Sequence, residues 1–233
     1  MNYRRLKLHL CLLGLILLAC GKQAGILAYA SSPAPPQRSL SEVLKSVERR
    51  YNRFKTVQMR FQQIYRQGNR ILREEEGILY LRKPGKMRWE YERPEPKLFL
   101  TDGRRLILYL PNENRMTETA VKESGDFRTP LRFLLGNMRF AEEFQRIETS
   151  TDFEPLEDGN LVLKAFSQRL EKRLEWEWVL FEVSPQYHIR RLVLQEPGDI
   201  QHEFRFEQEE SNLPLSDELF RFLPPEGTEI IRQ

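Results

Sequence analysis

The chain has 233 residues, 40% of them hydrophobic and 30% charged, and a formal net charge of +3 at pH 7. Three basic residues among the first seven carry all of that excess, and the part from Cys20 onward has acids and bases interspersed with no net charge, so we expect no nucleic-acid partner. Both cysteines, Cys11 and Cys20, lie in the first 20 residues, which excludes a disulfide within the rest of the chain and a thiolate metal site there.

Residues 1–19 have the layout of an export signal, because a basic start is followed by the apolar run LHLCLLGLILLA. About 12 apolar residues are too few to cross a hydrocarbon core of about 30 Å as a helix. We therefore predict an exported chain that is otherwise soluble.

The leader offers two cleavage sites. The run Leu17-Leu18-Ala19-Cys20 resembles a lipobox, at which a leader is cut and the cysteine thiol is acylated, whereas Ala28-Tyr29-Ala30 is a small-residue site that would extend the leader to residues 1–30. We favour Cys20, because it stands directly at the end of the apolar run. Residues 20–38 would then form a flexible tether rich in Pro, Ser and Ala, and residues 39–233 one domain.

The predicted domain opens with a helix that starts at Ser39. Ser39 and Glu42 have the spacing of a capping box. An apolar stripe recurs at helical spacing at Leu40, Val43, Leu44, Val47, Tyr51 and Phe54. The stripe predicts a helix packed on a core, with basic residues on the opposite face.

About ten strands are predicted next, in an antiparallel meander. One face of the runs at 56–65 and 86–92 carries Met59, Phe61, Met87, Trp89 and Tyr91, while the other face is polar. The same alternation predicts strands through Leu174, Trp176 and Trp178 and through His202, Phe204 and Phe206. Such a sheet must curl and be covered, since its apolar face cannot stay wet.

Glycine-containing pairs predict the turns between these strands. Asp102-Gly103 predicts a type I′ hairpin turn, because glycine tolerates the positive φ that this turn requires. Gly68-Asn69, Pro84-Gly85, Asp158-Gly159 and Pro197-Gly198 predict other turns. A second short helix is predicted in RTPLRFLLGN, with Thr129 as its cap and Gly136 at its end.

The stretch GILYLRKPGKMRWEYERPEPKLFLTDGRRLILYLPNENRMT, residues 77–117, resembles the outer-membrane lipoprotein carrier proteins, the LolA family. The shared features are Gly77, a basic residue before Pro84, the Trp89–Tyr91 strand, Pro94, the Asp102-Gly103 turn, Tyr109 and the TPLRFLLG helix. The ending LFRFLPPEGTEII is similar to the close of that family. The resemblance covers about residues 40–231.

This resemblance implies a mainly β fold: an incomplete, strongly curved antiparallel barrel with a lid of short helices. It further implies a periplasmic carrier that holds the acyl chains of lipoproteins between barrel and lid. Its partners would be an inner-membrane lipoprotein-releasing transporter and an outer-membrane receptor. Such a carrier performs no covalent chemistry and needs no cofactor.

The resemblance also implies roles for particular residues. The basic residue that ties the barrel to backbone carbonyls of the lid is Lys83 here, where arginine is common in the family; lysine makes a less directional tie because it lacks the guanidinium fork. The acyl cavity would be lined by Met59, Phe61, Met87, Trp89, Tyr91, Leu131, Phe133 and Leu134. An ordinary core residue is the alternative interpretation of each of these.

The sequence has two alternatives to the carrier, an enzyme and a membrane-anchored receptor. An enzyme is disfavoured because the sequence contains no G-x-S-x-G, phosphate-binding glycine loop or H-E-x-x-H motif, and the run Glu74–Glu76 is typical of a solvated surface. Histidines 188 and 202 are isolated and do not predict a metal site. A membrane-anchored receptor of the same fold, the LolB type, remains the alternative that a lipidated Cys20 would favour.

Overall fold

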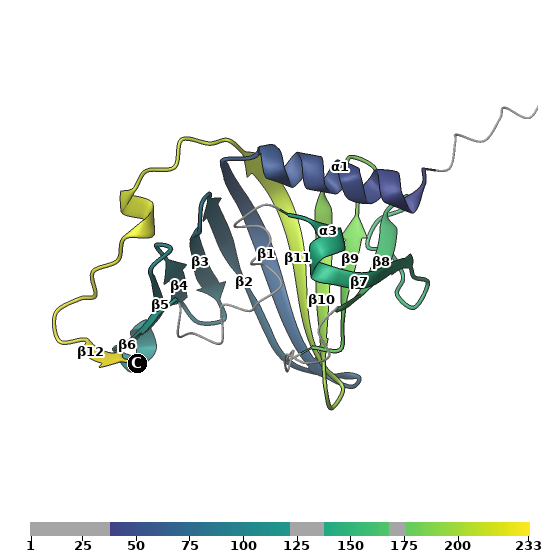
Figure 1. Cartoon of the computed structure of the whole chain (residues 1–233). Helices are drawn as coiled ribbons and strands as arrows, with labels where there is room; N and C mark the ends of the chain where they lie inside the picture. Colours follow the sequence, from purple (N-terminus) through teal and green to yellow (C-terminus); the bar gives the residue numbers. More distant parts are fainter. Residues whose placement is uncertain (1–37, 122–137, 168–175) are drawn as a thin grey trace, which may run out of the picture. The chain divides into compact units, whose positions relative to one another are not determined.

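The computed structural model describes residues 38–121, 138–167 and 176–233. In these residues one twelve-stranded sheet runs in the order β12-β6-β5-β4-β3-β2-β1-β11-β10-β9-β8-β7 (Figure 1). The strands are β1 (Thr56–Gln67), β2 (Arg70–Arg82), β3 (Lys86–Arg93), β4 (Lys97–Thr101), β5 (Arg105–Leu110), β6 (Arg115–Ala120), β7 (Phe144–Thr149), β8 (Leu161–Ser167), β9 (Trp178–Val183), β10 (Ile189–Glu196), β11 (Ile200–Ser211) and β12 (Glu229–Arg232). The helical elements are α1 (Leu40–Arg53), α3 (Phe140–Glu143) and the 3-10 turns η1 (Pro111–Glu113) and η3 (Glu218–Phe220).

The sheet is open, with β12 and β7 at its two edges. Every neighbouring pair is antiparallel except β12 and β6, which run parallel. Two antiparallel runs, β1–β6 and β7–β11, are joined where β1 pairs with β11, so the first strand lies in the middle of the sheet. The predicted fold class, an incomplete antiparallel barrel with short helices, is confirmed. The predicted single meander of about ten strands is wrong in count and in order.

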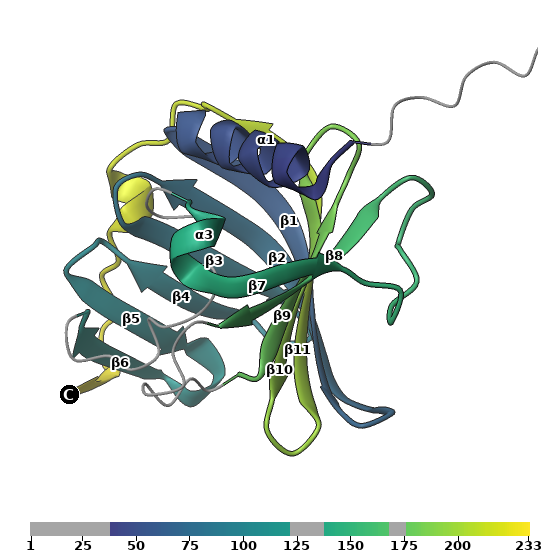
Figure 2. The ribbon, with the colours of Figure 1, turned by 45° about the vertical axis from the view of Figure 1, so that its right-hand side comes forward.

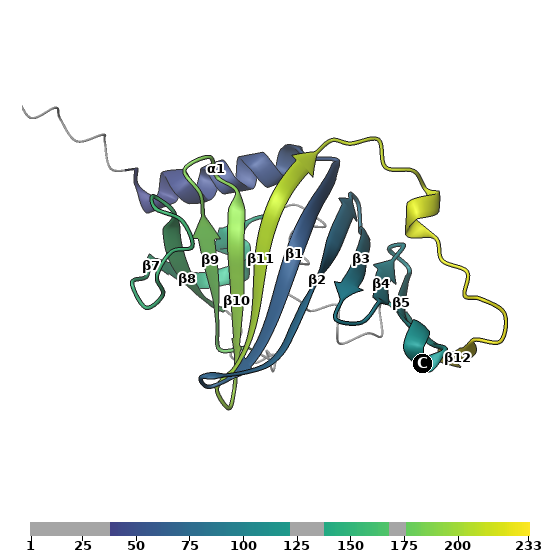
Figure 3. The same cartoon turned by 180° about the vertical axis from the view of Figure 1, so that it is seen from behind.

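The sheet curves around one face, and α1 lies across the strand ends on that side (Figures 1 and 2). The view from behind shows the outer face of the central strands β10, β11, β1 and β2 (Figure 3). The strands curl because each apolar inner face has to be removed from water, and a single curved sheet brings those faces together.

Helix α1 forms as the sequence predicts. Ser39 accepts a hydrogen bond from the Glu42 amide at 3.3 Å, and the Glu42 carboxylate accepts one from the Ser39 amide at 3.0 Å, which completes the capping box. Val43, Val47 and Tyr51 are buried. The apolar stripe thus faces the sheet.

The main core lies between α1 and the concave face. It joins residues of α1 to inward-facing residues of β1–β3 and β7–β11, together with Met138 just before α3 and Phe140 at its start. Alternate residues of these strands point into it, as the period of two requires. The cluster contains Met59, Phe61, Met87, Trp89, Phe204 and Phe206 among its buried members.

The convex face is also partly covered. Phe222 packs on Leu98, Leu100, Ile107 and Met116 at the outside of β4–β6. Farther along the sheet, Phe153 and Trp178 pack on Val162, Leu180 and Val193. The sequence predicted that Trp176 and Trp178 lie on the same face of one strand. This prediction is wrong, because the outer face also has an apolar cluster that Trp178 can join.

Strand β9 begins only at Trp178, and its residues are buried from both sides. Trp176 packs against the inner core, whereas Trp178 packs against the outer cluster. Leu174, the third residue of that predicted strand, lies outside the described residues. The strand through Phe204 and Phe206 is confirmed as β11.

The predicted turns lie between strands where the glycine pairs stand. At the β4–β5 turn the positive φ, +92°, falls on Gly103 and not on Asp102. The Asp102 carboxylate instead accepts hydrogen bonds from the amides of Arg104 and Arg105, both at 2.8 Å. A type I′ turn needs positive φ at both central residues. The hairpin is therefore confirmed, but its predicted turn type is wrong.

Candidate functional site

The apolar wall of the concave face is built from three neighbouring strands. Met59 and Phe61 come from β1, and Met87, Trp89 and Tyr91 come from β3, with β2 between them. The first four are only 2–3% exposed, and Tyr91 is partly buried. The structure thus brings together five of the eight residues predicted to line a cavity. Leu131, Phe133 and Leu134, with the predicted helix at 129–136, lie outside the described residues.

Aromatic rings interlock across this wall. The Phe61 ring centroid lies 4.6 Å from that of Trp89 and 4.9 Å from that of Tyr91, both in edge-to-face geometry. Phe204 from β11 continues the row, 5.6 Å from Trp89. The methionines Met59, Met87 and Met138 pack in the same cluster and supply flexible, polarizable surface.

One polar edge interrupts the wall at Tyr91. Its hydroxyl donates to the Gln63 side chain at 2.8 Å, and burial, with a smaller contribution from Glu75, raises the pKa of Tyr91. The Lys97 ammonium lies 4.0 Å from the Tyr91 ring centre and binds both carboxylate oxygens of Glu75, at 2.6 and 2.7 Å. Tyr91 therefore marks the boundary between the apolar wall and a charged rim.

A buried polar cluster fixes the C-terminal half of α1 to the strand ends. The Tyr51 hydroxyl donates to Glu209 at 2.6 Å and accepts from the Ile189 amide at 2.9 Å. Arg50 forms an ion pair with the same carboxylate at 2.8 Å, and the Glu209 side chain is only 3% exposed. His188 Nδ1 stands 3.1 Å from Glu209, and burial lowers the pKa of His188. These bonds attach α1 to β11 and to the start of β10.

Lys83 forms a second attachment of the helix. Its ammonium donates to the Tyr51 carbonyl at 2.8 Å, at the end of α1, and burial lowers the Lys83 pKa. Lys83 thus makes a bond from the barrel to a backbone carbonyl of a covering helix. The partner that the sequence predicted, the helix at 129–136, lies outside the described residues, so that part of the prediction stays a prediction.

Helix α1 is bonded to the segment that leads into α3 as well. The Asn52 side chain accepts from the Met138 amide at 2.6 Å and donates to the Met138 carbonyl at 2.9 Å. Glu48 accepts from the Phe140 amide at 2.7 Å. Helix α1 is therefore joined by two hydrogen bonds to Met138, just before α3, and by one to the first residue of α3.

Sequence reasoning missed most of this polar attachment. Tyr51 was placed on the apolar stripe for its ring, and its hydroxyl gave no indication of a partner. Glu209 stands in the charged run at the end of β11, where a solvated carboxylate is the ordinary expectation. Asn52 lies on a helix flank with no local signature. Each of these contacts joins segments far apart in the sequence.

The described residues hold no group of three or more His, Cys, Asp or Glu side chains that could bind a metal ion. No described helix is both long enough and apolar enough to cross a bilayer. The features of the concave face are thus apolar side chains, a charged rim and hydrogen-bonded covering helices.

Residues 52–223 match the family model described as outer membrane lipoprotein carrier protein LolA. The chain belongs to this family. The match includes all the strands of the apolar wall and Lys83.

Curated relatives extend the family likeness over nearly the whole chain. An outer-membrane lipoprotein carrier protein of Coxiella burnetii is 28% identical over 229 residues, which cover 98% of this chain and 99% of the relative. The protein of the same name from Nitrosomonas europaea is 27% identical over 89% of this chain and 96% of its own length. A crystal structure of an uncharacterized conserved protein from Thermus thermophilus superposes with a TM-score of 0.53 at 15% identity, and covers 84% of this chain and 100% of that one. That structural likeness concerns the fold alone.

Proposed function

We propose that this LolA-family protein binds the acyl chains of lipoproteins against the concave face of its sheet and carries them from the inner to the outer membrane. The observation that carries the proposal is the single apolar wall of Met59, Phe61, Met87, Trp89 and Tyr91 in a chain whose relatives are named lipoprotein carriers. Each buried CH₂ group of a ligand contributes about 0.8 kcal/mol, so a wall of this size can hold long acyl chains without specific polar contacts.

The cover over the wall has to move for this to happen. Four of the five wall residues are almost fully buried, and a ligand can reach them only when the helices that cover the concave face are displaced. The bond from Lys83 to α1 and the bonds from Asn52 of α1 to Met138 hold the empty state closed. Acyl chains then compete with the protein's own packing, and the balance between the two sets loading and release.

The carrier would work in the periplasm, and it would use two partners. An inner-membrane lipoprotein-releasing transporter would supply the cargo, and an outer-membrane receptor would accept it. The cargo binds by burial and not by a bond-forming reaction, so the protein would act as a transport factor and not as an enzyme.

A membrane-anchored form is the second candidate, and the run ending in Cys20 favours it. Acylation of Cys20 would convert residues 20–38 into a tether and the protein into an anchored carrier or a receptor of the LolB type. The several acyl chains of a mature lipoprotein hold a protein stably at a membrane. Cleavage after Ala30 would instead leave a free carrier.

Uptake of an acyl probe tests the carrier proposal. In a background of Trp176→Phe and Trp178→Phe, Trp89 is the remaining tryptophan of the chain, and its emission should change as a lipopeptide binds saturably. Two further variants are compared in the otherwise wild-type chain by the amount of labelled lipopeptide retained, and not by emission. Met87→Trp, which fills the wall, should lower capacity, whereas Met116→Trp, in the cluster outside β4–β6, should leave uptake unchanged. Absence of saturable uptake, in an assay where a family carrier binds, would reject the proposal.

Release kinetics test the role of Lys83. Lys83→Leu should load with lipopeptide but release it more slowly, because the closed empty state has lost one of its attachments. Lys86→Leu is the matched control: its ammonium binds Asp217 at 2.6 Å, outside the α1 attachment. Equal release rates in wild type and Lys83→Leu would assign Lys83 to stability alone.

Fractionation of the exported protein distinguishes the anchored from the free form. A mass spectrum of the mature protein should give Cys20 with acyl groups at its N-terminus. Cys20→Ser should then block processing or expose cleavage after Ala30 and release the protein from the membrane. Ser31 as the N-terminus of the wild-type protein in the soluble fraction would remove the anchor.

A further inference from the structure

The outward side of α1 carries a row of cations. Lys45, Arg49 and Arg53 are spaced four residues apart, so they follow one line along the helix over about 12 Å. All three are exposed, and within the described residues none of them forms an ion pair. Like charges at this spacing destabilise an isolated helix slightly. Arg49 bonds the Ser46 hydroxyl and Arg53 lies in the last turn, where a cation interacts favourably with the helix dipole, but no ion pair accounts for the row.

Within the described residues neither carboxylate of this helix forms an ion pair with the row, although the Lys45 charge, after the hydrogen bonds from Ser39, helps to lower the pKa of Glu42. Glu42 is engaged with Ser39 in the capping box, and Glu48 accepts the Phe140 amide. Arg38 precedes the helix and Lys55 follows it, both exposed, so the cationic surface extends beyond each end. We call Lys45, Arg49 and Arg53 the α1 cation row.

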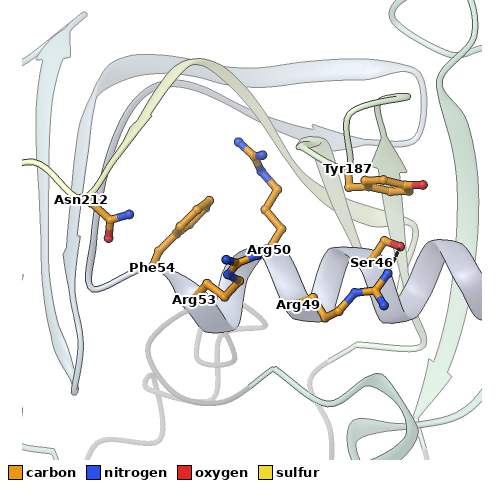
Figure 4. A pocket seen from close by; sticks show the side chains of 7 residues that line it. All are labelled: Ser46, Arg49, Arg50, Arg53, Phe54, Tyr187 and Asn212. Carbon is orange, nitrogen blue, oxygen red and sulfur yellow. Dashed lines mark hydrogen bonds between the residues drawn. The ribbon is translucent and has the colours of Figure 1, made fainter.

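A groove opens beside the C-terminal half of the row. Its volume is about 600 Å³, and Figure 4 shows its lining, in which Tyr187 and Asn212 lie apart from the helix. Arg49 is held by a 2.8 Å bond to the Ser46 hydroxyl. Arg50, which binds Glu209 and lies over the Phe54 ring, is already neutralised. Arg49 and Arg53 are therefore the lining cations whose charge remains available to an anion.

We propose that the α1 cation row is a membrane-docking surface that binds the phosphate headgroups of anionic phospholipids, with the groove receiving headgroups at Arg49 and Arg53. Charge complementarity is the first reason. The second is the place where the chain arrives: Cys20 lies 18 residues before Arg38, a reach of at most about 60 Å, and Arg38 leads directly into α1. An acylated Cys20 would therefore tether the chain by the segment that leads into α1, the first described element after it.

The surface fits a headgroup layer better than an acidic protein. Protein interfaces usually have an apolar centre, and the large exposed apolar residues of the described chain lie at positions 71, 72, 156, 223 and 230, none of them on α1. A layer of phosphates requires only cations on flexible stems along an accessible line. The inference goes beyond cargo binding and does not depend on the acyl cavity, although its second reason rests on the anchored form proposed above.

Vesicle co-sedimentation tests it. Every arm would use the chain that begins at Ser31, the form left by cleavage after Ala30, so that no acyl group on Cys20 contributes. Vesicles of phosphatidylcholine with phosphatidylglycerol would be compared with phosphatidylcholine alone. Each Lys or Arg near an anionic surface contributes on the order of fivefold in affinity, so Lys45→Gln with Arg49→Gln and Arg53→Gln should weaken binding more than tenfold.

The matched control removes three other exposed arginines, Arg70, Arg104 and Arg221, by the same change to Gln. It has the same net charge as the row variant and should bind within about twofold of wild type. Binding should also disappear at about 1 M salt, where the screening length falls to about 3 Å. Thermal melts would establish that both triple variants are folded.

Two results would overturn the proposal. The first is equal loss of vesicle binding in the row variant and in the control, which would reduce the effect to net charge. The second is no preference of wild type for phosphatidylglycerol, even if the row variant loses lipoprotein transfer. That outcome would assign the row to an acidic protein partner. Neither result bears on lipopeptide uptake, so this proposal and the carrier proposal can fail separately.

Discussion

At the scale of single residues, position 77 shows how closely two strands approach. A Cβ atom added to Gly77 would lie 1.8 Å from the Glu90 carbonyl oxygen on β3, and the register of β2 and β3 shifts between Glu76 and Gly77. Backbone atoms cannot move aside as a side chain can. Glycine at this position is thus explained by packing.

Gly77→Ala should destabilise the protein by about 2–3 kcal/mol or more, because the added methyl group forces β2 and β3 apart. Glu74→Ala, at an exposed position of the same strand, should change stability by less than about 0.5 kcal/mol. Urea unfolding followed by circular dichroism measures both. Equal midpoints for the two variants would contradict the close approach.

The Tyr51 hydroxyl is a second feature at the scale of single residues. It donates to Glu209 and accepts from the Ile189 amide. Tyr51→Phe would leave a buried carboxylate and a buried amide short of a partner, at a cost of about 1–3 kcal/mol. Tyr187→Phe is the control, since the ring of Tyr187 lies beside Arg38 and its hydroxyl is not part of this cluster. If Tyr187→Phe lost as much stability as Tyr51→Phe, the cost could not be assigned to the two hydrogen bonds of the Tyr51 hydroxyl.

At the scale of elements, the C-terminal segment 212–233 covers the outer face of β3–β6 before it ends in β12. Arg88 donates to the Leu219 carbonyl at 3.0 Å, and Thr56 donates to the Leu213 carbonyl at 2.7 Å. Phe222 packs on Tyr109, with ring centres 4.8 Å apart. The segment thus gives strands β3–β6 a second packed layer that the concave core does not supply.

Phe220 anchors this segment and is 1% exposed, whereas Leu223 is 90% exposed. Phe220→Ala should cost about 3–5 kcal/mol, because it removes a fully buried ring and leaves a cavity. Leu223→Ala should cost less than about 0.5 kcal/mol. Thermal unfolding compares them, and a Phe220→Ala melt close to that of wild type would show that the segment adds little to stability.

At the scale of the whole molecule, the strands do not close into a ring. The concave face of the open sheet is instead covered by helices that hydrogen bonds hold in place. The polar cluster around Glu209 and the Lys83 bond hold α1 to the sheet, and Asn52 and Glu48 join it to the start of α3. Hydrogen bonds of this kind contribute about 1 kcal/mol each. Such a cover can be fixed in the empty protein and still be displaced by a ligand that buries many CH₂ groups.

The two histidines of the domain make its stability depend on pH. Burial lowers the pKa of His188 and of His202 below the ordinary value of 6.5. Below pH 6.5 the unfolded chain therefore binds more protons than the folded one, so stability is complete above pH 6.5 and decreases as the pH falls toward the folded pKa values. The free energy of unfolding should be lower at about pH 5.5 than at about pH 7.5.

A variant without these histidines checks the assignment. His188→Gln with His202→Gln removes both histidines that follow the predicted leader, and it should flatten the change in unfolding free energy between the two pH values. The carboxyl groups of Glu203 and Asp217, whose pKa values are lowered, lose their stabilising contribution only at more acidic pH. An unchanged slope in the double variant would assign the dependence to other groups.

The sequence by itself determined what local periodicity and local chemistry encode. The capping box at Ser39, the stripe through Val43 and Val47, and the alternation that puts Phe61 and Trp89 on one face can be derived from neighbours a few residues apart. The family resemblance then indicated an incomplete barrel. Only the tertiary structure decided the contacts between distant segments. Glu209 becomes a buried acceptor for the hydroxyl of Tyr51, 158 positions away, because β1 pairs with β11. Lys83, at the end of β2, donates to the backbone carbonyl of Tyr51. The alternation of apolar and polar residues in a strand indicates which face of the strand is buried. It does not indicate which distant segment packs against that face.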